Sequence, residues 1–426
     1  MVCVRLRGKL IQCAFFVTTL VLFFFHYVNF LNQRKLSKNR YTPNVQTPRL
    51  ISWKQRSPRR LVFDIDCQRI IGGDKIYLDY ARRVMKSKEY EFSNDADMKI
   101  KAKHCSRFLE IYDYGYFFLS KEELEFPLAY TILTHKDAVQ TEKLLRAIYR
   151  PHNIYCIHVD KSSSASLHNA MAAIASCFPN VFIVSKTEDV IYASFSRLKA
   201  DLNCMTDLLR RTDVHWKYVV NLPSQEYPLK TNAEIVKILK LFNGSSSIEV
   251  LSSNKYHHRF ERSHKVVGNK VKPTNKKKKL PPYGITIAKG SVYGVFSRSF
   301  VNYSLNDVRA QKILKWFEDT YSPDEFFWAT LSKNSHLINV PGLFSDGFNG
   351  NRLWIAATVS WKDKRNCHGK YVRFICVFGI GDLKELVSQN TLFANKFYHD
   401  YQPLALKCLE EWHYNKTLSQ IPFDSL

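Results

Sequence analysis

The stretch Leu128-Ala-Tyr-Thr-Ile-Leu-Thr134 decides the fold of this 426-residue chain. It is a short and nearly continuous apolar run, which is typical of a strand buried on both faces. A helical pattern through Leu144, Leu145 and Ile148 follows it, and Ile154-Tyr-Cys-Ile-His-Val-Asp160 is a second strand of the same kind. The alternation then continues, with strands expected over residues 181–184 and 217–222 and helices over residues 166–178, 194–209 and 233–241.

Strands that alternate with helices predict an α/β fold in which a mostly parallel central sheet is flanked by helices. In such sheets, ligands bind beyond the carboxyl ends of the strands. Asp160 and Asn221 each lie at the end of a predicted strand, so both are placed where a nucleotide would bind. The chain has neither a Gly-x-Gly-x-x-Gly fingerprint nor a P-loop, which argues against a dinucleotide enzyme or a P-loop NTPase.

The N-terminal region predicts a membrane anchor. From Leu10 to Leu31 the sequence is almost entirely apolar, and a helix of that length spans roughly 33 Å, about one bilayer core. A cleaved signal peptide is the competing interpretation, but Tyr27-Val-Asn-Phe-Leu-Asn32 offers no small-residue cleavage site. We therefore expect a cytoplasmic tail over residues 1–9, a transmembrane signal anchor over residues 10–31, a stem and N-terminal extension over residues 32–120, and a lumenal domain over residues 121–426.

Cysteines and glycosylation sequons support a lumenal body. Eight of the ten cysteines follow the apolar segment: Cys67, Cys105, Cys156, Cys177, Cys204, Cys367, Cys376 and Cys408. An even number without a Cys-x-x-Cys pair is better explained by disulfides than by zinc. Three Asn-x-Ser/Thr sequons occur, at Asn243, Asn302 and Asn415. Together these features favour a single-pass type II membrane protein of the secretory pathway.

The net charge of +25 invites a nucleic-acid interpretation, but its distribution does not support one. The first 60 residues carry twelve Lys or Arg and no acidic residue, and residues 255–279 carry ten Lys or Arg and one Glu. These two segments account for nearly all of the excess, so it lies in a stem and in one loop rather than across a binding face. Lys276-Lys-Lys-Lys279 resembles a nuclear localisation signal, which the membrane anchor makes improbable. We interpret it as a solvated loop that can attract anionic ligands.

The string Tyr321-Ser-Pro-Asp-Glu-Phe-Phe-Trp-Ala-Thr330 is the strongest chemical motif. It places Asp324 and Glu325 beside three aromatic residues, and a carboxylate next to flat apolar surface suits a general base for sugar chemistry. A structural interpretation is also open. Ser322, Pro323 and Glu325 fit the N-cap, the N1 proline and the N3 partner of a capping box.

Several blocks of sequence resemble the core 2/I-branching β-1,6-N-acetylglucosaminyltransferase family (glycosyltransferase family 14). They are spread over about residues 120–410, roughly two-thirds of the chain. These blocks are Leu144-Leu-Arg-Ala-Ile-Tyr149, Tyr155-Cys-Ile-His-Val-Asp160, Tyr192-Ala-Ser194, Ser196-Arg-Leu-Lys-Ala-Asp-Leu-Asn-Cys204, the Tyr321–Thr330 string, Gly381-Asp-Leu383 and Phe393-Ala-Asn-Lys-Phe397. The resemblance implies a GT-A-like nucleotide-binding fold with the catalytic domain in residues 121–426, in the lumen of the Golgi apparatus.

The resemblance also implies a reaction. It is the inverting transfer of GlcNAc from UDP-GlcNAc, in β-1,6 linkage, to a GalNAc or Gal residue of a glycoprotein or glycolipid glycan. Glu325 is the implied catalytic base, and Arg373 and Lys396 are the implied cations on the diphosphate, in place of a metal ion. The remaining implied site residues are Asp160, Tyr192 and Arg197 for the donor, and Glu249, Lys255 and Arg259 for the acceptor.

No metal cofactor is implied. The Asp-x-Asp strings Asp64-Ile-Asp66 and Asp95-Ala-Asp97 both precede the first core strand, so we do not expect them to bind a metal ion. The same resemblance implies four disulfides, and sequence alone does not choose among the pairings. They are Cys67–Cys408, Cys105–Cys177, Cys156–Cys204 and Cys367–Cys376.

One segment departs from the family pattern. Asn221-Leu-Pro-Ser-Gln-Glu-Tyr-Pro228 replaces the usual Asn-x-Cys-Gly-x-Asp-Phe-Pro, so Pro223, Ser224 and Glu226 stand where the family has cysteine, glycine and aspartate. The altered turn leaves open a catalytically silent homologue that binds UDP or glycan without transfer. The subfamily also stays open. So does the acceptor, which can be core 1, core 3 or poly-N-acetyllactosamine.

Overall fold

The computed structural model describes residues 59–114, 119–251, 254–344, 354–363 and 366–420. The predicted tail and signal anchor, residues 1–9 and 10–31, lie outside these ranges. Within them, no helix is both long and apolar enough to cross a membrane. The described residues all belong to one compact unit.

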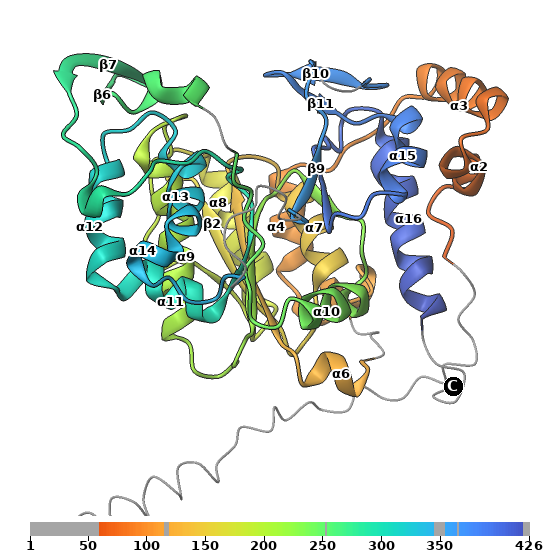
Figure 1. The fold of residues 1–426 in the computed structure, drawn as a ribbon. Coiled ribbons are helices and arrows are strands. Elements are labelled where there is room, and N and C mark those ends of the chain that lie inside the picture. Colours follow the sequence, from red (N-terminus) through yellow and green to blue (C-terminus); the bar gives the residue numbers. More distant parts are fainter. Residues whose placement is uncertain (1–58, 115–118, 252–253, 345–353, 364–365, 421–426) are drawn as a thin grey trace, which may run out of the picture. The chain divides into compact units, whose positions relative to one another are not determined.

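The centre of this unit is a five-stranded sheet with the order β3-β2-β1-β4-β8 (Figure 1). Its strands are β1 (Leu128–Thr134), β2 (Ile154–Val159), β3 (Val181–Ile183), β4 (Tyr218–Pro223) and β8 (Val295–Ser297). The first four are parallel, as predicted, and β8 runs antiparallel to β4. Every residue of β1 and β2 is buried, which explains why these strands read as continuous apolar runs.

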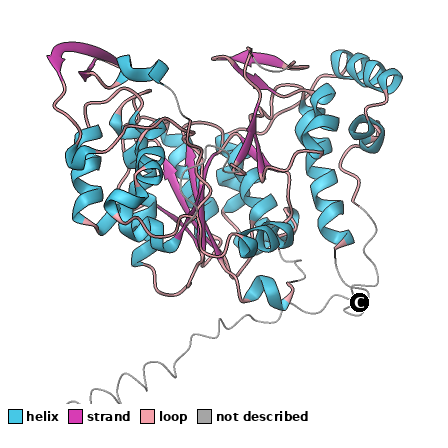
Figure 2. Ribbon diagram, viewed as in Figure 1, coloured by secondary structure: helices cyan, strands magenta, loops and turns pink. Residues whose placement is uncertain are grey.

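Helices cover both faces of the sheet (Figure 2), because successive strand residues point to opposite sides. Tyr130 and Ile132 of β1 pack in one core cluster, and Ala129 packs in the other. The first cluster is closed by α7 (Ala138–Ile148), α8 (Ala165–Ser176) and α10 (Asn232–Leu241). The second is closed by α9 (Phe195–Arg210), α11 (Arg298–Asn306), α12 (Val308–Phe317) and α13 (Phe327–Lys333). The predicted α/β architecture is therefore confirmed.

A second, smaller sheet carries the C-terminal part of the site. It consists of β5 (Glu226–Pro228), β12 (Phe393–Asn395) and β9 (Ala357–Val359), with β12 in the middle. Two hairpins stand apart from both sheets: β10 (Lys370–Val372) with β11 (Ile375–Val377), and β6 (Arg262–Val267) with β7 (Lys270–Lys277). The remaining short elements are α6 (Lys121–Leu124), α14 (Ser335–Ile338), α15 (Leu383–Val387), η2 (Asn254–Arg259), η3 (Pro282–Gly284), η4 (Pro323–Glu325) and η5 (Ile380–Asp382).

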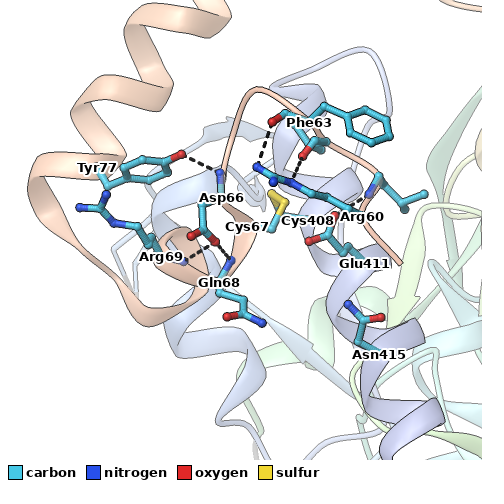
Figure 3. Close-up of a disulfide and its surroundings, with 12 residues drawn as sticks. Arg60, Phe63, Asp66, Cys67, Gln68, Arg69, Tyr77, Cys408, Glu411 and Asn415 are labelled. Carbon is cyan, nitrogen blue, oxygen red and sulfur yellow. Dashed lines mark hydrogen bonds between the residues drawn. A yellow bond between two sulfur atoms is a disulfide. The ribbon is translucent and has the colours of Figure 1, made fainter. Parts of the chain in front are cut away.

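Residues before the first strand form helices that pack on the body: α2 (Cys67–Gly72), α3 (Lys75–Ser87), α4 (Asp95–Ala102) and α5 (Cys105–Ile111). Helix α2 lies against the C-terminal helix α16 (Pro403–Ser419), and Cys67–Cys408 joins the two (Figure 3). Nearby, the backbone N–H of Leu61 donates to Glu411 at 2.6 Å. The two Asp-x-Asp strings cap these helices: Asp66 caps α2, and Asp97 completes a capping box on α4.

Three of the four expected disulfides are formed: Cys67–Cys408, Cys105–Cys177 and Cys367–Cys376. The fourth, Cys156–Cys204, is not formed, and both thiols are free and fully buried. The packing of α9 on β2 places them in hydrogen-bonding contact without a covalent link. Burial raises the pKa of both thiols, so both stay protonated.

The three sequons differ in accessibility. Asn243 is exposed in a turn after α10, and Asn302 is exposed on α11. Asn415 lies on α16, where its amide accepts from the backbone N–H of Arg59 at 2.9 Å and donates to the Arg59 carbonyl at 3.1 Å. A glycan on Asn415 would displace these two hydrogen bonds, so Asn243 and Asn302 are better placed as acceptors than Asn415.

Candidate active site

Glu325 ends the short helix η4, and its setting differs from the expected capping box. Ser322 adopts a left-handed backbone conformation (φ 49°) and its side chain caps nothing in the helix. Its backbone N–H donates instead to the carbonyl of Ala193 at 2.8 Å. The capping-box interpretation is wrong because this tertiary hydrogen bond fixes Ser322 outside the extended region that an N-cap needs. The Glu325 carboxylate is thus available for other contacts.

Two cations hold that carboxylate. Arg259 donates to the Glu325 Oε2 atom at 2.7 Å, and the Lys289 ammonium lies 3.3 Å from the same atom. Both cations also lie over the ring of Tyr256, at 5.1 Å and 4.9 Å from its centre. The expected acceptor residue Arg259 and the expected base Glu325 are therefore brought together. Lys289 was missed by sequence analysis, although it directly precedes the Gly290-Ser-Val-Tyr293 block.

The other expected acceptor residues lie on neighbouring segments. Glu249 belongs to a stretch that runs beside Lys289, where the backbone N–H of Leu251 donates to the Lys289 carbonyl at 2.7 Å. A Cβ atom at Gly290 would come within 1.9 Å of the Glu249 carbonyl oxygen, so only glycine permits this close approach. Lys255 lies in η2, four residues before Arg259, and its side chain is outside the described residues.

Asp324, the neighbour of Glu325, lies in a buried polar network with Arg197 and Asp201. Its side chain is nearly fully buried, and burial raises its pKa to about 6 while the neighbouring Arg197 opposes that rise. Arg197 donates to Asp201 at 2.6 Å, and Asp201 also accepts from Asn221 at 3.3 Å. Asp201 thus joins the expected donor residue Arg197 to Asn221, which lies inside β4 rather than at its end as the sequence predicted. Asp201 was not predicted, although its spacing from Arg197 is the four residues of a helical ion pair.

Tyr192 connects the two sides of the site. Its ring is 67% exposed, and the Arg373 guanidinium lies 5.1 Å from the ring centre. Burial raises the Tyr192 pKa, and the negative charge of Glu325 raises it further. Tyr192 precedes Ala193, a second left-handed residue (φ 63°), whose carbonyl accepts the hydrogen bond from Ser322. The Tyr192 turn and the Glu325 turn therefore support each other.

Arg373 occupies a strained position at the tip of the β10–β11 hairpin. Arg373 and Phe374 form its two-residue turn, with φ of 52° and 64°. Such turns favour asparagine and glycine, and a left-handed non-glycine residue costs about 1–2 kcal/mol. Strain of this kind concentrates at functional sites. The Cys367–Cys376 disulfide links β11 to the segment that precedes β10.

Lys396 completes a group of cations. Its side chain is nearly buried and donates to the Val372 carbonyl at 3.1 Å. Burial lowers the pKa of Lys396 to about 8, and the positive charges of Arg373 and Lys136 lower it further. Lys136 and Lys396 both lie over the ring of Tyr398, at 4.3 Å and 5.6 Å from its centre. None of the three cations forms an ion pair with any described residue. Lys136 lies two residues after the end of β1, and the sequence analysis did not predict it as a site residue.

Asp160 lies directly after β2, where the sequence placed it. Its Oδ1 atom accepts from the backbone N–H and the hydroxyl of Ser162, at 3.0 Å and 2.8 Å, and from the backbone N–H of Val190 at 3.4 Å. The carboxylate therefore ties the end of β2 to the segment that leads to Tyr192. This arrangement leaves the second carboxylate oxygen, Oδ2, for a ligand.

The altered turn after β4 leads into the small sheet. Ser224 donates its backbone N–H to the Leu133 carbonyl at 2.9 Å, and Glu226 pairs with Asn395 across β5 and β12. The Asn395 amide donates to the Glu226 carboxyl at 3.0 Å. Burial raises the Glu226 pKa to about 8, so this carboxyl is protonated at neutral pH. Glu226 therefore supports the strand end that carries Lys396.

The geometry thus gives a carboxylate with two cations on one side, three uncompensated cations on the other, and an exposed tyrosine ring between them. Such a site can take a proton from a hydroxyl and stabilise negative charge on an anionic leaving group.

Similarity to known proteins identifies the family of the chain. A family model described as Core-2/I-Branching enzyme matches residues 128–387. The N-acetyllactosaminide β-1,6-N-acetylglucosaminyl-transferase of Homo sapiens is 43% identical over 315 residues, which are 71% of this chain and 76% of that protein. The β-1,3-galactosyl-O-glycosyl-glycoprotein β-1,6-N-acetylglucosaminyltransferase of Homo sapiens is 39% identical over 378 residues, covering 84% of this chain and 87% of that protein. A human relative with the same name and the number 3 is 39% identical over 364 residues, 82% of each chain. The chain is a glycosyltransferase and belongs to the Core-2/I-branching enzyme family.

Proposed function

We propose that the protein transfers GlcNAc from UDP-GlcNAc, with inversion and in β-1,6 linkage, to a Gal or GalNAc residue of a glycan. The observation that carries this proposal is that Tyr192 lies near both the Glu325 carboxylate and the Arg373 guanidinium, which in turn lies near Lys396. An inverting transfer needs a base on the acceptor and positive charge on the leaving diphosphate, from opposite faces of the sugar.

In this reaction Glu325 accepts the proton of the acceptor hydroxyl as that oxygen attacks the anomeric carbon. Arg373 and Lys396 bind the diphosphate and stabilise its charge as the bond to the sugar breaks, and no metal ion takes part. Tyr192 packs against the donor, and Asp160 accepts a hydrogen bond from its uridine part. Arg259, together with Glu249 and Lys255, positions the acceptor sugar.

The decisive experiment uses the full chain in detergent with EDTA, UDP-GlcNAc and three acceptors: core 1, core 3 and poly-N-acetyllactosamine. We expect transfer to at least one acceptor. Glu325→Gln should leave the Kd for UDP unchanged and reduce kcat on the order of a thousandfold. Glu318→Gln removes an exposed carboxylate from the preceding loop and is the matched control. Full turnover by Glu325→Gln would show that Glu325 is not the base.

A second candidate is a homologue that binds UDP or glycan without transfer. It is favoured by the ion pairs with Arg259 and Lys289 that already hold the Glu325 carboxylate, and by the changed turn at Pro223 and Glu226. UDP binding by a folded chain that neither transfers nor hydrolyses UDP-GlcNAc would establish this alternative.

We also propose that the protein is anchored in the Golgi membrane as a single-pass type II protein with residues 121–426 in the lumen. The apolar segment from Leu10 to Leu31, the disulfides and the exposed sequon at Asn243 support this placement. We expect the attached glycan to resist endoglycosidase H and the domain to be protected from protease in intact vesicles.

A further inference from the structure

The β6–β7 hairpin, together with Lys279, exposes a dense group of cations, which we call the basic hairpin. Its exposed cations are Arg262, Lys265, Lys270, Lys272, Lys276, Lys277 and Lys279. None of the seven forms an ion pair with a carboxylate in the part of the chain that the structure describes. The acidic residue next to it, Glu261, is instead hydrogen-bonded to His257 at 3.1 Å.

The pairing of the two strands places like charges opposite each other. Lys265 is the cross-strand partner of Lys272, and Arg262 is the partner of Lys277. Like charges in this position destabilise a two-stranded ribbon, which is only marginally stable on its own. The lysines therefore oppose the stability of the hairpin that carries them. A bound anion would remove this repulsion.

Interactions at the base of the hairpin hold it in place despite this repulsion. Lys278 is buried there in an ion pair with Asp319, and its ammonium lies 4.1 Å from the Trp316 ring centre. The Trp316 indole N–H donates to the Lys279 carbonyl at 2.9 Å, and the backbone N–H of His264 donates to the Asp319 carbonyl at 2.7 Å. The exposed cations thus project from a fixed base.

That base continues directly into the candidate active site. The His264 ring lies 5.7 Å from the Tyr321 ring, and the backbone N–H of Tyr321 donates to the Arg259 carbonyl at 3.1 Å. Arg259 in turn holds Glu325. In Figure 1 the β6–β7 and β10–β11 hairpins project from the same side of the molecule, the top of the view. The base of the basic hairpin is therefore connected to Glu325 through Tyr321 and Arg259.

We propose that the basic hairpin binds acidic acceptor glycans, through sulfate or sialic acid carboxylate groups on sugars next to the one that is modified. This inference rests on the proposed function, because it takes the acceptor to lie at Glu325. Lysine is a hydrated point charge on a flexible stem, which suits an anion of variable position better than a bidentate arginine does. The connection to the acceptor side favours a glycan over a membrane surface or an acidic peptide as the occupant.

The test compares the wild-type chain with a quadruple variant, Lys265→Gln, Lys270→Gln, Lys272→Gln and Lys276→Gln. The matched control neutralises four exposed lysines in and next to helices α3 and α4: Lys75→Gln, Lys86→Gln, Lys99→Gln and Lys103→Gln. Two quantities are measured: kcat/KM on neutral and on sulfated or sialylated versions of one acceptor, and the Kd for the acidic oligosaccharides alone. We expect the hairpin variant to weaken acidic-glycan binding and to lower kcat/KM on acidic acceptors roughly tenfold, with a weaker salt dependence. Neutral-acceptor turnover should not change.

Equal behaviour of the hairpin variant and the matched control would overturn the proposal. So would an equal loss on neutral and acidic acceptors, or a loss of binding only to an acidic peptide or to phosphatidylserine vesicles. The Kd measurement requires no turnover, so it tests the binding role of the basic hairpin independently of the proposed transferase function. Acidic-glycan binding by the hairpin in a chain that transfers to no acceptor refutes the proposed function alone.

Discussion

The lowered pKa of Lys396 makes a pH-dependent affinity for UDP the sharpest prediction. Burial lowers this pKa to about 8, and Arg373 and Lys136 contribute. Only the protonated ammonium attracts a diphosphate, which is fully ionised in this range. Above pH 8 the free protein must first take up a proton, so the Kd for UDP should rise about tenfold between pH 7 and pH 9, equivalent to about 1.4 kcal/mol. The measurement is titration calorimetry with UDP and EDTA.

Two substitutions at the same position supply the controls. Lys396→Arg keeps a cation that does not deprotonate in this range, so its Kd should be nearly independent of pH. Lys396→Gln should bind UDP weakly and equally at both pH values. Any titration of UDP itself would appear in all three proteins. A Kd that is flat for the wild type, or that rises equally in Lys396→Arg, would refute the role assigned to Lys396.

Two further predictions concern stability. Burial raises the Asp324 pKa from 3.8 to about 6, so its contribution to stability is complete well below pH 4 and is lost as the pH rises through 6. Asp324→Asn should remove a fall of about 2 kcal/mol in the free energy of unfolding, measured with urea at pH 4 and 7. The same reasoning applies to Glu226, whose pKa is raised by burial from 4.5 to about 8. Glu226→Gln should abolish a loss of about 4 kcal/mol between pH 4.5 and 9, and a difference from wild type that does not vary with pH would contradict either assignment.

The sequence predicted the central sheet because its strands are buried on both faces and therefore read as apolar runs. The limits of β2 and β4 differ from the prediction by one residue, since Asp160 follows β2 and Pro223 ends β4. The small sheet could not be predicted. Each of its strands has three residues, which is too short for any periodicity to be recognised.

The site was only partly predictable, because its contacts join distant parts of the chain. Arg259 and Glu325 are 66 residues apart, and no local pattern indicates that they pair. Lys289 and Lys136 are single lysines without a motif, so only the fold reveals them. At Ser322 the local pattern was misleading: the residues fit a capping box, but the hydrogen bond to Ala193 imposes a different backbone conformation.

The two halves of the site differ in how their charges are compensated. On one side Glu325 already has two cationic partners, so in the proposed function an acceptor would compete with Arg259 and Lys289 for the carboxylate. On the other side Lys396 is next to Arg373 and Lys136, with no carboxylate paired to any of the three among the described residues, and burial together with these two positive charges lowers its pKa. In the proposed reaction a donor diphosphate would relieve this repulsion, whereas an acceptor would displace part of an existing ion pair. We therefore expect the charges of the site to favour binding of the donor more than binding of the acceptor.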